Sequence, residues 1–106
     1  MMSKETHYQN GMELFSEDKL REAIEEFQQA LEYDSEYGDA LHALAMSYYH
    51  LGDIDEALVY GERLRSVDPD NVHAYTCLSM LYNAKGFIAK AEEMAESAAK
   101  LTLEDG

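Results

Sequence analysis

The sequence repeats with a period of 34 residues, and this periodicity limits the folds that the chain can adopt. Ala23, Ala57 and Ala91 lie 34 residues apart. Further sets keep the same spacing: Asp18, Gly52 and Gly86; Met12, Met46 and Met80; Leu14, Tyr48 and Tyr82. A fixed period of this length is typical of a solenoid built from stacked supersecondary units. Three such units account for nearly all of the 106 residues, so we expect one continuous array.

Each unit is predicted to form two helices with a short turn between them. In the middle unit, apolar residues recur at three- and four-residue steps over 41–51 and again over 54–67. Gly52 separates the two stripes because glycine takes the positive φ that ends a helix. Pro69 ends the second stripe because it disfavours helical angles at the preceding residue. The same plan predicts the other helices near 5–16, 19–33, 72–85 and 88–102.

These residues resemble the tetratricopeptide repeat (TPR). The middle unit carries its pattern at Leu41, Leu44-Ala45, Tyr48, Gly52-Asp53, Ala57 and Asp68-Pro69. The first unit supplies Gly11, Ala23, Phe27 and Ala30, and the third supplies Tyr75, Leu78, Tyr82, Gly86, Ala91 and Ala98. The resemblance implies an all-α fold, an α-solenoid of three helix-turn-helix repeats at approximately 4–37, 38–71 and 72–105. They would form a short right-handed superhelix within a single domain, 1–106.

The last predicted helix departs from the repeat pattern. It carries Glu92, Ala95 and Ala99 where the first unit has large apolar residues, which suits a solvent-facing cap. We expect a natural end of the array here. The alternatives are a truncated array, or a dimerisation face anchored by Ile88 and Met94.

The charge balance limits the classes of partner. The chain has 22 acidic and 8 basic residues, a formal net charge of -14. Nucleic acids and anionic membrane surfaces require basic residues, so neither is an expected partner. No apolar stretch is long enough for a secretory signal or a membrane helix, and Cys77 is the only cysteine. We therefore expect a cytoplasmic protein without an internal disulfide.

The resemblance also implies where a partner would bind, because the first helix of each TPR unit lines a concave groove. The expected lining is Tyr8, Met12 and Phe15 from the first unit; His42, Met46, Tyr49 and His50 from the second; and His73, Cys77, Met80 and Asn83 from the third. Methionine is flexible and polarizable, which suits surfaces that accept varied apolar groups. We expect the three periodic methionines to form a ladder along the groove; the alternative is that they pack as core.

One known use of this groove is excluded by the residues present. Many TPR proteins grip acidic tails with a two-carboxylate clamp of Lys, Arg and Asn. The equivalent positions in this chain are Tyr8, Met12, Ala43, His73 and Cys77, none of which is a permanent cation or an Asn. Net negative charge would further repel an acidic tail. We expect no carboxylate clamp.

Catalytic and metal sites are weakly indicated. His73 and Cys77 have the spacing of a thiolate–imidazolium pair, but no oxyanion site accompanies them. His42 could join these two residues as a metal ligand, yet a fourth ligand is missing. We expect no enzyme activity, no cofactor and no metal.

The sequence thus predicts a non-catalytic protein–protein interaction module, of the adaptor, scaffold or co-chaperone-like kind. It would bind a peptide segment with apolar anchors, and Glu5 and Asp39 would favour basic flanks. The alternative is a self-assembling structural repeat protein that stacks through its terminal helix. We expect a monomer, with a weak homodimer as the second choice.

Overall fold

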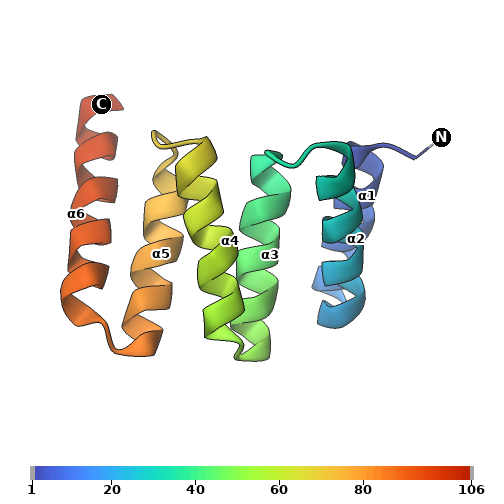
Figure 1. Cartoon of the computed structure of the whole chain (residues 1–106), viewed down its shortest axis with the longest axis horizontal. Helices are drawn as coiled ribbons and strands as arrows, with labels where there is room; N and C mark the ends of the chain where they lie inside the picture. Colours follow the sequence, from blue (N-terminus) through green and yellow to red (C-terminus); the bar gives the residue numbers. More distant parts are fainter. Residues whose placement is uncertain (1, 106) are drawn as a thin grey trace.

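The computed structural model describes residues 2–105 as a row of six helices (Figure 1). Their bounds are α1 Lys4–Ser16, α2 Leu20–Tyr33, α3 Gly38–Leu51, α4 Ile54–Val67, α5 Val72–Lys85 and α6 Ile88–Asp105. Consecutive helices run in opposite directions and pack on one another along the row. The array measures 42 × 29 × 20 Å. The expected all-α solenoid of three helix pairs is confirmed.

The odd-numbered helices form the inner side of the array. Besides its sequence neighbours, α3 contacts both α1 and α5. Within residues 2–105, α2 makes no such contact with α4, nor α4 with α6. The array therefore closes toward the odd-numbered helices, which line its concave side.

The turn inside each helix pair has a residue with left-handed backbone angles at the same repeat position. Gly52 has φ 83° and Gly86 has φ 85°, as expected for glycine at the end of a helix. Asp18 takes this position in the first pair with φ 63°, a conformation that Asp tolerates better than most residues. The backbone N–H of the following residue then donates back into the helix, as from Asp53 to Tyr48 O at 2.9 Å. The three helix pairs therefore share one type of turn, with the same backbone hydrogen bond.

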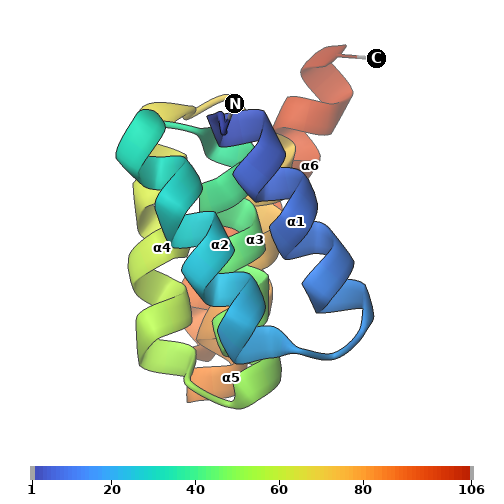
Figure 2. The ribbon, with the colours of Figure 1, turned by 90° about the vertical axis from the view of Figure 1, so that its right-hand side faces the viewer.

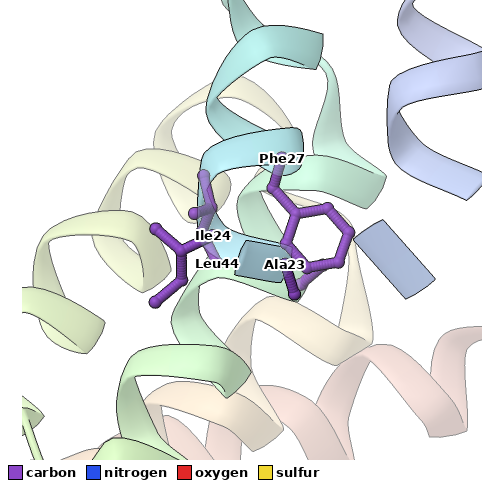
Figure 3. Close-up of a cluster of buried hydrophobic side chains, with 5 residues drawn as sticks. Ala23, Ile24, Phe27 and Leu44 are labelled. Carbon is purple, nitrogen blue, oxygen red and sulfur yellow. The ribbon is translucent and has the colours of Figure 1, made fainter. Parts of the chain in front are cut away.

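Small residues allow the two helices of each pair to approach closely. Ala23 and Ala57 are fully buried and Ala91 is 1% exposed, in agreement with the sequence prediction. Ala23, Ile24 and Phe27 from α2 pack beside Leu44 from α3, which joins the first pair to the second (Figure 3). Burying a side chain such as Phe27 or Leu44 stabilises the fold by roughly 1.5–3 kcal/mol.

In the last helix, three side chains are exposed as predicted, and a fourth, Met94, is buried instead. Glu92, Ala95 and Ala99 are exposed, and the C-terminal turns of α6 extend beyond the other helices (Figure 2). Ile88 is 53% exposed, but Met94 is only 2% exposed and packs with Leu78 and Tyr82. Met94 is therefore a core residue, and its predicted role as an anchor for dimerisation is wrong. None of the described helices combines the length and apolar character needed to cross a bilayer.

Candidate functional site

A cavity of about 240 Å³ opens on the concave side between α1 and α3. Its lining residues are Tyr8, Met12, Phe15, His42, Ala43, Met46 and His50. All except Ala43 belong to the lining predicted from the sequence. Ala43 is 6% exposed, and a small residue on an apolar stripe gives no signal that separates a cavity floor from a core. We call the seven residues the α1–α3 cavity.

Helical spacing brings these side chains together. Tyr8, Met12 and Phe15 follow one another at steps of four and three residues along α1, so they share one face. His42 and Met46 are four residues apart on α3 and face the same cavity. Because α1 packs directly against α3, the two rows of side chains face the same cavity.

Neighbouring rings hold the aromatic walls. The Tyr8 ring lies 5.9 Å from Phe27 and 5.7 Å from Tyr37 between ring centroids. At the other end, the centroid of Phe15 lies 5.5 Å from that of His50 in an edge-to-face arrangement. Such contacts favour defined ring orientations. The aromatic side chains of the cavity wall are thus held in place by their neighbours.

Most charged groups near the Tyr8 end of the cavity are acidic. Burial raises the pKa of the Tyr8 hydroxyl, and the Asp39 carboxylate raises it further. The pKa of Tyr37 is raised by burial and by the carboxylates of Asp39 and Glu5. Lys4 is the nearby cation, and its ammonium group pairs with Asp34 at 2.7 Å and lies 4.8 Å from the centre of the Tyr37 ring. This end of the cavity therefore carries an excess of negative charge.

Two histidines meet where α3 faces α5. The ring centroids of His42 and His73 are 5.9 Å apart. Burial lowers the pKa of His42, and the neighbouring His73 lowers it further, while Asp39 acts in the opposite direction. His42 thus contributes a neutral imidazole to the cavity wall at neutral pH.

The three periodic methionines occupy different environments. Met12 is 40% exposed, whereas Met46 and Met80 are half-buried. Met46 also packs against the buried cluster that contains Ala45 and Cys77. Met12 and Met46 line the cavity and Met80 lies outside it, so the cavity contains only part of the expected ladder.

The predicted residues of α5 do not line the cavity. Cys77 is 4% exposed and packs against Ala45, Ala57 and Leu81, so the expectation that it forms part of the groove surface is wrong. His73 and Asn83 are exposed beyond the cavity. The remaining predicted residue, Tyr49 of α3, is half-buried with its ring 5.4 Å from His50.

The buried thiol is a poor nucleophile, and the described imidazoles do not gather into a metal site. Burial raises the pKa of the Cys77 thiol to about 11, which leaves it protonated and weakly nucleophilic at neutral pH. Within residues 2–105, no three His, Cys, Asp or Glu side chains are placed to hold a metal ion together. The arrangement is instead an open, largely apolar recess on a repeat scaffold.

An all-α array of helix pairs with such a recess defines a class of repeat protein. The sequence pattern of the tetratricopeptide repeat matches residues 14–75. The chain belongs to the tetratricopeptide repeat family, as the sequence predicted. A search of curated proteins found no match.

Solved structures support the same fold. A crystal structure of MamA is 27% identical with a TM-score of 0.93, and the match covers 97% of this chain and 60% of that chain. YrrB, described as a TPR protein with an unusual peptide-binding site, is 25% identical with a TM-score of 0.87; the match covers 95% of this chain and 52% of YrrB. The second TPR of Spaghetti (RPAP3), bound to an HSP90 peptide, is 19% identical with a TM-score of 0.89 and coverage of 94% and 93%, and it shows the fold alone. The chain thus spans only a little over half of the MamA and YrrB chains.

Proposed function

We propose that this protein is a non-catalytic interaction module that binds a peptide segment in its concave groove, with an apolar side chain seated in the α1–α3 cavity. The similarity to YrrB, which is described as having an unusual peptide-binding site, supports an interaction role. The observation that carries the proposal is the cavity itself, an apolar recess between Tyr8, Met12 and Met46 on the inner side of the array.

The size of the cavity favours a side chain as its occupant. Pockets for small molecules and cofactors commonly enclose about 300–1,000 Å³. The α1–α3 cavity encloses about 240 Å³ and is open on one side. One or two apolar side chains of a peptide fit this space, and flexible Met12 and Met46 can adjust to their shape.

Electrostatics favour basic residues beside the apolar anchor. Glu5 and Asp39 lie near the Tyr8 and Tyr37 rings, and the whole chain carries a formal charge of -14. Acidic peptides are disfavoured for the same reason and because the five clamp-equivalent positions lack Lys, Arg and Asn. We therefore propose recognition without a carboxylate clamp.

Peptide display on the purified protein tests the proposal. Selected peptides should share an apolar residue next to a basic one, and peptides in which acidic residues flank the apolar one should not bind detectably. Met12→Glu should weaken the selected peptides at least tenfold because it places a charge at the cavity mouth, where Met12 is 40% exposed. Val59→Glu is the matched control on α4, since Val59 is 50% exposed and outside the cavity. Equal losses in the two variants, or selection of acidic peptides, would contradict the proposal.

A second candidate function is self-association through the end of the array. Phe87 and Ile88 are each 53% exposed, and Leu103 on α6 is 80% exposed. This apolar exposure favours contact with another copy of the chain. Light scattering after size-exclusion chromatography, on the wild type and on Ile88→Ser, tests it. A monomer at about 1 mM would rule out assembly, and a dimer lost in Ile88→Ser would support it.

A further inference from the structure

Three of the four histidines lie on the inner side of the array. His42 and His50 line the α1–α3 cavity, and His73 faces His42 from α5. His7 differs, because its Nδ1 pairs with Glu26 at 2.6 Å between α1 and α2. The groove therefore contains imidazoles without a carboxylate at hydrogen-bonding distance among the described contacts, whereas the remaining histidine has one.

We propose that protonation of His42 releases the apolar anchor, so that peptide binding weakens as the solution becomes acidic. This inference rests on the proposed peptide-binding function and adds its regulation. His42 forms part of the wall that an apolar side chain would cover, so a bound anchor removes the remaining water from the imidazole. A charged imidazolium in that position loses hydration without gaining a partner.

The groups that face His42 decide the direction of the effect. Tyr8 of α1 lines the same cavity and is uncharged, and its hydroxyl stays protonated because its pKa is raised. His73 of α5 disfavours a second positive charge beside it, while Asp39, one turn earlier on α3, favours one. No group of α2 or α4 contributes among the described residues. Burial is the largest influence, so the neutral form of His42 is favoured already in the free protein.

Thermodynamic linkage then requires reciprocal behaviour. If an apolar occupant lowers the pKa of His42, protonation of His42 must lower the affinity for that occupant by the same factor. Because burial lowers the pKa of His42 from the ordinary value of histidine, affinity should be constant at neutral pH and should fall only as the solution becomes acidic. If binding is coupled to a single proton, the loss of affinity per pH unit grows as the pH falls and approaches tenfold.

The neutral dye N-phenyl-1-naphthylamine is a suitable probe, because it fluoresces in apolar surroundings and carries no charge over this pH range. We expect saturable binding at pH 7.5 and weaker binding at pH 5.5, at constant ionic strength. Circular dichroism at both pH values would show that the protein remains folded. His42→Gln, which keeps a polar neutral group in place, should remove most of the pH dependence. His7→Gln is the matched control and should leave it unchanged.

The outcomes separate the two proposals. Absence of dye binding at pH 7.5, or binding that is unaffected by Met12→Glu, would overturn the apolar cavity as a binding site. Binding at pH 7.5 that does not weaken by pH 5.5, or that weakens equally in His42→Gln, would overturn the proton switch while the proposed binding function stands.

Discussion

The ring of Phe27 on α2 packs directly against the backbone of Gly11 on α1. A Cβ atom placed on Gly11 would lie 2.6 Å from Cδ1 and 2.9 Å from Cζ of this ring. Phe27 is fully buried, and Ile24 and Leu44 pack around it in the same cluster (Figure 3). This contact sets the distance between the first two helices and thereby the position of Met12, the next residue along α1.

Gly11→Ala should therefore destabilise the protein. Alanine favours a helix interior by about 1 kcal/mol over glycine, but here its methyl group would overlap a buried ring. Overpacking of this kind costs roughly 1–3 kcal/mol or more. Because the overlap with a buried ring is large, we expect the upper part of this range, which leaves a net loss of about 1–2 kcal/mol, measured by chemical denaturation followed by circular dichroism.

Gly38→Ala is the matched control. Gly38 begins α3, and a Cβ there would meet only Leu64 Cδ1, at an ordinary contact distance of 3.4 Å. This variant should be neutral or slightly more stable. If the two variants had equal stabilities, the close contact between Gly11 and Phe27 would be wrong.

Much of the fold could be predicted because its signals are local. The helix expected near 5–16 spans Lys4–Ser16, and the one expected near 19–33 spans Leu20–Tyr33. Glycine at Gly52 and Gly86 and the single proline mark boundaries whatever the tertiary structure. Only the last helix, expected to end near 102, continues to Asp105, because no breaking residue stops it there.

Side-chain burial at the groove edge was harder to predict. Cys77 and Thr76 are adjacent on α5, about 100° apart around the helix, yet Cys77 is buried and Thr76 exposed. Their burial depends on which side of α5 the neighbouring helices cover. Here Gly61 on α4 lacks a side chain, and Leu78 packs so closely that a Cβ on Gly61 would lie 2.9 Å from its Cδ2. The periodicity of the sequence does not predict this close approach of α5 to α4.

The burial of Cys77 predicts slow thiol chemistry. At pH 7.5 the native protein should react with Ellman's reagent at less than about one-tenth of its rate in 6 M guanidinium chloride, because the thiol is both buried and protonated. Rapid, complete labelling of the folded protein would place Cys77 on the groove surface instead.

The same thiol predicts a dependence of stability on alkaline pH. Burial raises the pKa of Cys77 from 9.0 to about 11. The unfolded thiol loses its proton first, so this contribution to stability is full below pH 9 and is lost as the pH rises toward 11. Denaturation curves of the wild type and Cys77→Ala should therefore converge over this interval. A constant difference in the free energy of unfolding would contradict the shifted pKa.

Salt should stabilise the protein. Acidic residues outnumber basic ones by 22 to 8, so mutual repulsion opposes the compact state. Ion pairs such as Lys4–Asp34 and Lys85–Asp55 offset only part of it, and such partly exposed pairs are individually weak. The thermal midpoint should rise between about 20 mM and 0.5 M NaCl as counterions screen the repulsion. A flat or falling midpoint would indicate that local pairing dominates.

Oxidation of methionine distinguishes groove from core residues within one sample. Met12 is 40% exposed, Met46 and Met80 are half-buried, and Met94 is 2% exposed. Under mild peroxide, sulfoxide should form first at Met12, later at Met46 and Met80, and last at Met94, as measured by peptide mapping with mass spectrometry. Helicity should persist while Met12 is converted, because a polar sulfoxide at an exposed position costs little.

Dye or peptide binding should fall at the same stage, because the sulfoxide adds polarity to the wall of the α1–α3 cavity. Conversion of Met12 only when helicity is lost would show that it is core, and the cavity could then not serve as the binding site.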